Sequence, residues 1–246
     1  MPGLYKLICI DLDGTLIGKP GNISDYNVNA IQKAKEEGAI VCIASGRPYG
    51  QIAHYAARCG LDTPVVACNG AHVYNPKTGE YWMKEDLPTE EAVKILKFCD
   101  ERDIIWNMCT HFTFYSRYED GSFPATRVFV KNDYSSRNTK DSPDAELYRK
   151  YGIPSPERVV VRTEEEYRSA LDKGCGKISI FPKNEEERDI VESYYDTSRP
   201  GTVCKKAADF LEEIMSDKSS KWGAIQLLAD KLGVPHEQIC VFGDNM

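Results

Sequence analysis

Short apolar runs that stop abruptly at polar or glycine-containing segments are the feature that most constrains the fold of this chain. Residues 4–10, 39–44 and 63–68 form the first three runs. A compact run of this length is typical of a strand that is buried on both faces. Helical patterns separate the runs, and this alternation predicts a parallel sheet with right-handed crossovers. Ligands bind such sheets at the carboxyl ends of the strands.

The helices between these strands are indicated by their end signals. Ser24 is a favoured capping residue for a helix that reaches about Glu37 and stops at Gly38. Pro48 suits the first turn of a second helix, which extends to about Arg58. The C-terminal part returns to this pattern, with an amphipathic helix over residues 219–232 and a fourth buried strand over residues 238–242. We therefore predict one α/β core, built from residues 1–84 and 216–246.

The middle of the chain has a different pattern. Its strand-like runs are richer in β-branched and aromatic residues and alternate more clearly, which suits a sheet with one solvated face. Residues 73–82 read as a hairpin, and Thr89 is expected to cap a helix over residues 90–101. We predict an inserted α+β domain over residues 85–215. The expected strands are 104–109, 112–117, 158–161 and 177–181, the helices 164–172 and 185–195, and an exposed loop 133–143.

Composition narrows the possible partners and the compartment. The formal net charge of −7 argues against a nucleic-acid partner, because phosphate backbones need basic patches. No segment is long and apolar enough to span a membrane, and the N-terminal apolar run is too short for a signal peptide. The nine cysteines are odd in number and include no CxxC pair, which favours reduced thiols in the cytoplasm over disulfides or zinc.

Two carboxylates directly follow the first strand. Asp11 and Asp13 lie one residue apart, and Gly14 allows the backbone to turn sharply there. Oxygens of this kind bind a hard cation such as Mg²⁺. Asp11 has the chemistry of a phosphoryl acceptor, and Asp13 that of a general acid and base. The alternative is a turn with two solvated acids.

The other strand ends also carry polar groups. Ser45 and the Gly46 amide could hold a phosphate, although serine is also a common helix cap. Lys221 could neutralise phosphate charge, with Lys218 as a nearby rival. Asp244 could be a further metal ligand or simply a turn acid.

The four motifs together resemble those of the haloacid dehalogenase superfamily of phosphatases, in the same order. Residues 11–16 (DLDGTL) match its first motif and residues 44–48 (ASGRP) its second. Residues 219–224 (SSKWGA) match the lysine motif, which favours Lys221, and residues 242–245 (FGDN) the start of the last motif. Residues 69–71 (NGA) are similar to a signature of the Cof-type subgroup. The resemblance implies a Rossmann-like core with an inserted cap of the C2B type, as in class IIB members.

The resemblance also implies roles for individual residues. Asp11 would be the nucleophile, and Asp13 the acid–base group. Mg²⁺ would be held by Asp11, by Asp13 through its backbone carbonyl, and by Asp244. The phosphoryl group would be held by Ser45, the Gly46 amide and Lys221. From their positions at strand ends, Arg47 and Asn69 are also expected to face the site and could contact substrate; the alternatives are a surface arginine and a turn asparagine.

One departure concerns the end of the sequence. In the family, the last motif continues into a helix and another strand, whereas this sequence stops at Met246. We therefore expect that the chain is a truncated form, with an apolar edge beside residues 238–242.

The sequence predicts a Mg²⁺-dependent phosphomonoesterase for small phosphorylated metabolites such as sugar phosphates. A phosphomutase of the same superfamily and a non-catalytic metabolite-binding protein are the alternatives. A nucleotide-dependent kinase is disfavoured, because the chain has no GxxxxGK[ST] loop. No oligomeric state is indicated. Candidates for substrate recognition by residue type alone are Tyr115, Arg117, Tyr118 and Arg127.

Overall fold

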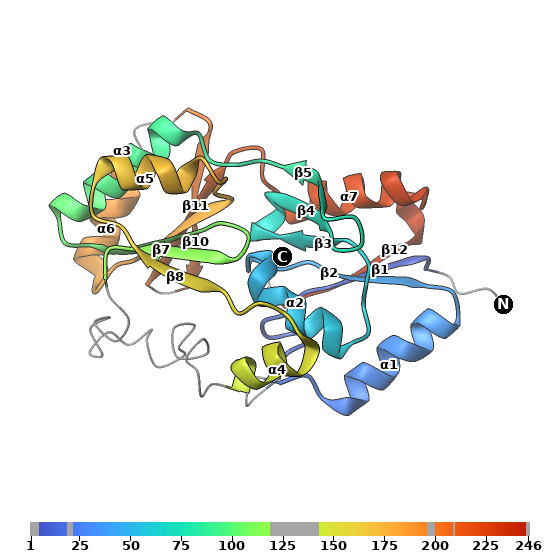
Figure 1. The fold of residues 1–246 in the computed structure, drawn as a ribbon. Coiled ribbons are helices and arrows are strands. Elements are labelled where there is room, and N and C mark those ends of the chain that lie inside the picture. Colours follow the sequence, from blue (N-terminus) through green and yellow to red (C-terminus); the bar gives the residue numbers. More distant parts are fainter. Residues whose placement is uncertain (1–4, 19–21, 119–142, 196–199, 209, 245–246) are drawn as a thin grey trace. The chain divides into compact units, whose positions relative to one another are not determined.

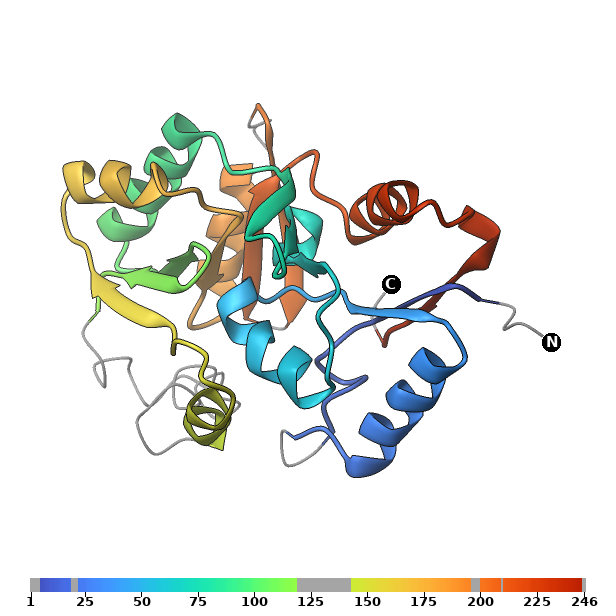
Figure 2. The ribbon, with the colours of Figure 1, turned by 45° about the vertical axis from the view of Figure 1, so that its right-hand side comes forward.

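The computed structural model describes residues 5–18, 22–118, 143–195, 200–208 and 210–244 (Figures 1 and 2). The chain forms two compact units. The core unit comprises residues 1–84, 147–153 and 219–246, and the inserted unit comprises residues 85–146 and 154–218. The sequence had placed residues 147–153 in the inserted domain, whereas in the structure they pack with the core unit.

A parallel sheet lies at the centre of the core unit, with strand order β12-β1-β2. These strands are Ile239–Phe242, Leu7–Ile10 and Ile40–Ile43. Successive side chains of a strand point to opposite faces, and in β2 both faces are apolar. Val41 and Ile43 belong to one hydrophobic cluster, and Cys42 belongs to another. The parallel α/β core that the apolar runs predicted is confirmed.

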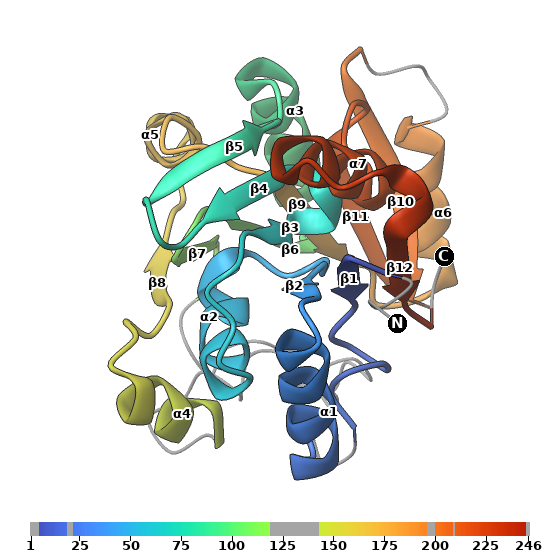
Figure 3. The same cartoon turned by 90° about the vertical axis from the view of Figure 1, so that its right-hand side faces the viewer.

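Helices cover both faces of this sheet, as Figure 3 shows. Helices α1 (Asp25–Glu36) and α2 (Tyr49–Arg58) pack into the hydrophobic cluster that contains Val41 and Ile43. Helix α7 (Lys221–Leu232) packs into the cluster that contains Cys42. Ser24 caps α1 by accepting a hydrogen bond from the Asn27 N–H at 3.1 Å, as the sequence predicted.

The third apolar run departs from the predicted sheet. Strand β3 (Val65–Ala67) touches β2 through one parallel bridge, Ala44 to Val66, and otherwise pairs antiparallel with β4 (His72–Asn75). Strand β5 (Glu80–Lys84) completes the predicted hairpin with β4. The reason is local: a sharp turn directly after Ala67 folds the chain back onto β3, so the new hairpin takes most of its hydrogen bonds.

The inserted unit contains a six-stranded sheet with order β10-β11-β9-β6-β7-β8, antiparallel except for β7 and β8. Its strands are β6 (Ile105–Cys109), β7 (Thr113–Ser116), β8 (Glu157–Val160), β9 (Lys177–Phe181), β10 (Thr202–Ala208) and β11 (Leu211–Ser216). Its helices are α3 (Thr89–Glu101), α5 (Glu164–Leu171) and α6 (Glu185–Tyr195). One hydrophobic cluster joins these helices to one face of the sheet.

Some expected elements changed. Pro88, not Thr89, is the N-cap of α3, and Thr89 is the first helical residue, so the predicted cap is wrong. Helix α4 (Pro143–Tyr151) and the β10–β11 hairpin were not predicted. Tertiary contacts hold α4 in place: its buried Tyr148, for example, donates to the Gly50 carbonyl at 2.7 Å. The expected loop over residues 133–142 lies outside the described residues.

The remaining predictions about the whole chain concern membranes and thiols. Among the described residues, no helix combines the length and the apolar composition that a bilayer crossing needs. All nine cysteines are free thiols, and most of them are buried.

Candidate active site

Asp11 stands at the carboxyl end of β1 and pairs with the start of α7. Its backbone N–H donates to the Phe242 carbonyl at 2.9 Å, which fixes the residue between β1 and β12. Lys221 Nζ lies 2.8 Å from Asp11 Oδ1, and the Asp11 side chain is 15% exposed. Burial raises the pKa of Asp11, and the ammonium of Lys221 opposes that shift. The structure thus joins two predicted site residues that are 210 positions apart in sequence.

The position of Lys221 follows from the way α7 begins. Ser220 caps the helix, because its hydroxyl accepts from the Gly223 N–H at 3.2 Å, and Lys221 is the first helical residue. A cation is unfavourable at the positive end of a helix. The carboxylate of Asp11 compensates for this, so the pair holds both side chains in place. The rival Lys218 belongs to the inserted unit.

Asp13 is held by Arg47 through two hydrogen bonds. Arg47 Nε and Nη2 donate to the two carboxylate oxygens at 2.8 and 2.6 Å. The Arg47 side chain is only 4% exposed, and its guanidinium lies 5.4 Å from the ring centroid of Tyr55. A buried, bidentate and aromatic-supported arginine is rigid. Arg47 therefore contacts a site carboxylate in this structure, while its predicted contact with substrate stays a prediction.

Asp244 follows β12 and lies against Gly14. A Cβ atom on Gly14 would overlap the Asp244 carboxylate, and a Cβ on Gly243 would lie 3.7 Å from the Cβ of Asp11. Gly14 has a φ of +79°, a conformation that favours glycine. The bend at Gly14 thus leaves room for the Asp244 side chain beside the end of β1.

The donors around Gly14 fit a hard divalent cation. Asp11 and Asp244 offer carboxylate oxygens, which Mg²⁺ prefers. Within the described part of the chain, no three side chains of His, Cys, Asp or Glu converge as a metal site. The Asp13 carboxylate is engaged by Arg47, and the backbone carbonyl of Asp13 as a metal ligand stays a prediction.

Ser45 and Gly46 form a tight loop after β2. Ser45 is buried, and its hydroxyl accepts from the Arg47 N–H at 3.2 Å. A Cβ on Gly46 would lie 2.7 Å from Asn69 Oδ1, so the Asn69 side chain rests on this glycine. The structure therefore brings Asn69 to the predicted phosphate loop. Its expected contact with substrate remains a prediction.

The candidates chosen by residue type in the inserted unit are engaged locally. Tyr115 is buried and accepts from Lys173 Nζ at 3.2 Å. Arg117 donates to the Asp100 carbonyl at 3.0 Å, and Tyr118 donates to Asp103 at 2.9 Å. Arg127 lies outside the described residues.

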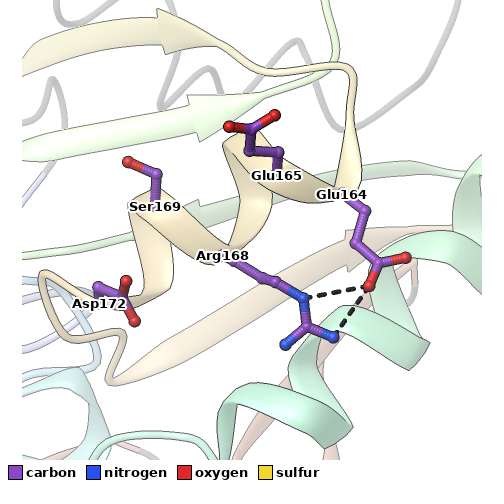
Figure 4. A pocket seen from close by; sticks show the side chains of 5 residues that line it. All are labelled: Glu164, Glu165, Arg168, Ser169 and Asp172. Carbon is purple, nitrogen blue, oxygen red and sulfur yellow. Dashed lines mark hydrogen bonds and ion pairs between the residues drawn. The ribbon is translucent and has the colours of Figure 1, made fainter.

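A surface hollow beside α5 does not involve the predicted site. Figure 4 shows its five lining side chains: Glu164, Glu165, Arg168, Ser169 and Asp172. Arg168 donates to Glu164 at 2.9 Å and to Glu90 at 2.6 Å, and Lys97 donates to Glu164 at 2.9 Å. Acidic side chains outnumber the basic ones here, so the hollow keeps a negative balance that disfavours an anionic substrate.

Two features of the site were missed by sequence reasoning. The Arg47–Asp13 pair could have been suspected from charge, but not its geometry. Gly70 packs against the start of α7, where a Cβ would overlap the Ser220 carbonyl. The only signal for this contact in the sequence was the place of Gly70 beside Asn69.

Comparisons with known proteins identify the family of this chain. A family model described as haloacid dehalogenase-like hydrolase matches residues 8–246. A 5-amino-6-(5-phospho-D-ribitylamino)uracil phosphatase of Bacillus subtilis (strain 168) is 27% identical over 244 residues, covering 97% of this chain and 80% of that protein.

Solved structures share the fold. A haloacid dehalogenase-like hydrolase from Bacteroides thetaiotaomicron superposes with a TM-score of 0.76 at 18% identity, covering 98% of this chain and 82% of that one. A structure described as a HAD subclass IIB sugar phosphatase superposes with a TM-score of 0.69 at 20% identity, covering 97% of this chain and 80% of that one. At these identities the likeness shows the fold alone.

The family match and the phosphatase relative confirm the predicted enzyme class, a phosphomonoesterase. Because the matching family model spans nearly the whole sequence, the chain belongs to the haloacid dehalogenase-like hydrolases.

Proposed function

We propose that this protein is a Mg²⁺-dependent cytoplasmic phosphatase that hydrolyses small phosphorylated metabolites, sugar phosphates first among them, through a phosphorylated Asp11. The observation that carries the proposal is the contact of Asp11 with Lys221 at 2.8 Å, at the end of β1 and beside Asp244. A carboxylate that is partly desolvated and aligned by an ammonium group is suited to attack phosphorus. The nine free thiols support a reducing compartment.

The first half-reaction transfers the phosphoryl group to Asp11. A carboxylate oxygen of Asp11 forms a bond to phosphorus while the bond from phosphorus to the leaving oxygen breaks. Asp13 gives the leaving oxygen its proton.

The second half-reaction restores the enzyme. Water attacks the same phosphorus, Asp13 accepts the proton of that water, and the bond from phosphorus to Asp11 breaks. The two hydrogen bonds from Arg47 hold the Asp13 carboxylate in place for this step. One water is consumed for each phosphate released, and no further reactant is required.

The remaining groups bind and neutralise. Lys221, Ser45 and the Gly46 amide hold phosphoryl oxygens. Asp11, Asp244 and the Asp13 carbonyl would hold Mg²⁺, which supplies positive charge for the phosphate oxygens when it is bound. Sugar phosphates as the substrate class are supported by the solved sugar phosphatase with the same fold, and a second class to test comes from the ribitylaminouracil phosphatase.

The test is phosphate release from sugar phosphates, nucleotides, the ribitylaminouracil phosphate and an aryl phosphate, with Mg²⁺ and with chelator. We expect turnover that needs Mg²⁺ and falls by a factor of about 10⁴ or more in Asp11→Asn. Asp62→Asn is the matched control, because Asp62 is an exposed acid of the same unit that pairs with Lys77.

Two readouts separate this proposal from its competitors. Intact mass after rapid acid quenching should show one added phosphoryl group, absent from Asp11→Asn. A mutase would give rearranged substrate with little free phosphate, and a binding protein would give equilibrium binding without turnover. Absence of phosphate release from every compound, by a folded protein with Mg²⁺, would contradict the proposal.

A further inference from the structure

A buried turn with an unusual backbone follows β3. Cys68, Asn69 and Gly70 have φ angles of +50°, +56° and +91° in succession. Residues other than glycine rarely adopt this conformation, and two in a row store strain that the surrounding packing must offset. Cys68 is fully buried and Gly70 is buried as well. A strained turn of this kind indicates a backbone path set by its neighbours rather than by local preference.

One neighbour is the start of α7. A Cβ on Gly70 would overlap the carbonyl of Ser220 and lie 2.6 Å from the backbone nitrogen of Lys221. Both are backbone atoms at the first turn of the helix, so no side-chain rotation could relieve the clash. Lys221 is the residue that reaches Asp11. The closeness of Gly70 to α7 therefore fixes the position of the Lys221 backbone, from which the side chain reaches Asp11.

The other neighbour is the loop after β2. The Cys68 N–H donates to the Arg47 carbonyl at 2.9 Å, and the Asn69 N–H donates to the Ser45 carbonyl at 3.1 Å. The Asn69 side chain rests on Gly46, where a Cβ would lie 2.7 Å from Asn69 Oδ1. The turn therefore contacts two separate parts of the site, the lysine and the phosphate loop.

We propose that the turn Cys68–Gly70 is a positioning element, in which Gly70 sets the first turn of α7 so that Lys221 meets Asp11, and Asn69 seats the Ser45–Gly46 loop. This inference rests on the proposed function, in which Lys221 and the Ser45–Gly46 loop bind the phosphoryl group. It differs from the sequence-based expectation that Asn69 contacts substrate. Loss of a positioning residue lowers kcat, because it displaces another group that acts in the reaction. Loss of a contact that binds substrate and transition state equally raises KM instead.

The main test is Gly70→Ala, compared with Gly233→Ala. Gly233 closes the other end of α7 with a φ of +67°, and a Cβ there would meet nothing within 4 Å. The two substitutions therefore impose the same kind of backbone strain, but only one displaces Lys221. We expect Gly70→Ala to lower kcat roughly 100-fold, because small displacements of a catalytic group cost about this much. Gly233→Ala should keep the kcat of the unmodified protein.

A double variant shows whether Gly70 acts through the lysine. In a Lys221→Met background, Gly70→Ala should cause little further loss of kcat. Losses that multiply instead would overturn the assignment, as would a folded Gly70→Ala protein with full kcat.

Asn69→Gly tests the second half and guards against a Gly70 variant that does not fold. It removes the side chain that rests on Gly46 and relieves the strain at a positive φ, so the fold should persist. We expect kcat to fall about tenfold with KM nearly unchanged. A raised KM at unchanged kcat would instead make Asn69 a substrate contact.

Crystal structures of the variants separate this inference from the proposed function. Lys221 Nζ should lie beyond hydrogen-bond distance of Asp11 in Gly70→Ala and within it in Gly233→Ala. If no compound is hydrolysed by the unmodified protein, the proposed function fails, and these two structures still decide whether Gly70 positions Lys221. An unchanged Lys221–Asp11 contact in Gly70→Ala would overturn the positioning claim.

Discussion

The two main sheets of this protein distribute their polar residues in opposite ways. In the parallel sheet β12-β1-β2, apolar side chains cover both faces of β1 and β2, and the polar groups lie beyond the strand ends, as Asp11 and Ser45 do. In the inserted unit, only one face of the sheet joins a hydrophobic cluster. The opposite face carries a row of polar residues in register across five strands: Ser116, Asn107, Ser179, Glu213 and Lys205.

This difference has a simple cause and a functional consequence. A strand covered on both sides has no place for a polar side chain except at its ends, so parallel strands gather chemistry at one edge. A sheet face that lies outside the hydrophobic cluster can carry polar groups along its length, even where they are buried, as Ser179 and Glu213 are. Mutations at the ends of the parallel strands should therefore change the reaction, whereas mutations within the polar row should change stability first.

The largest effect that would sharpen this comparison is expected from Glu213→Gln. Lys177 and Glu213 form an ion pair in the inserted unit, with side chains 10% and 11% exposed. Removing the carboxylate takes its negative charge away from the buried ammonium of Lys177, which should cost about 3–5 kcal/mol of unfolding free energy. Urea denaturation measures it. Asp62→Asn breaks the exposed pair with Lys77 and should cost less than about 1 kcal/mol. Similar losses in both variants would contradict the contrast.

The next effect compares two lysines three positions apart. Lys221→Met removes the partner of Asp11 and should lower kcat/KM about 100-fold, equivalent to about 2.7 kcal/mol. Lys218→Met removes an exposed lysine that belongs to the inserted unit, and activity should stay within about twofold. Steady-state kinetics on the best substrate decides between them. Equal losses would mean that the lysine motif acts through its overall charge.

A smaller effect on the reaction is expected from Arg47→Met. Asp13 would lose both hydrogen bonds that fix its carboxylate. We expect kcat to fall about tenfold for alkyl phosphates, whose leaving oxygen needs a proton, and less for an aryl phosphate, whose leaving group does not. A leaving-group series measures this. Arg58→Met is the control: Arg58 is the last residue of α2, the helix that follows Arg47 in the chain, and it contacts the Ile23 carbonyl. A uniform loss across the series would argue against a role through Asp13.

The smallest effect concerns pH and Glu212, a buried acid of β11 in the inserted unit. Burial raises the pKa of Glu212 above its ordinary value of 4.5. The unfolded chain then releases this proton more readily than the folded one, so the Glu212 contribution to stability declines as pH rises above 4.5 and levels off above the raised folded pKa. Glu212→Gln should remove that decline in urea titrations across the range. Glu186→Gln, at an exposed position of α6, should leave it unchanged.

Elements that depend on local pattern were predictable. Strand β9 and helix α6 begin and end at the predicted residues, 177–181 and 185–195, because periodicity and flanking signals are local properties. The β4–β5 hairpin followed in the same way from its turn residues. The sequence placed β3 in the parallel sheet, whereas in the structure it pairs mainly with β4. The turn after Ala67 that folds the chain back gave no signal that the sequence analysis used.

The candidate site, too, has features that the sequence predicts and features that only the folded chain determines. The residues that carry the chemistry could be listed from motifs at strand ends, since strand ends of a parallel sheet converge. The contacts between them could not be listed: Arg47 with Asp13, Gly70 with the start of α7, and the Asp244 carboxylate beside Gly14 all join segments distant in sequence. A one-dimensional pattern carries the identity and face of a side chain, but the direction in which it reaches depends on packing among segments that meet only in the folded chain.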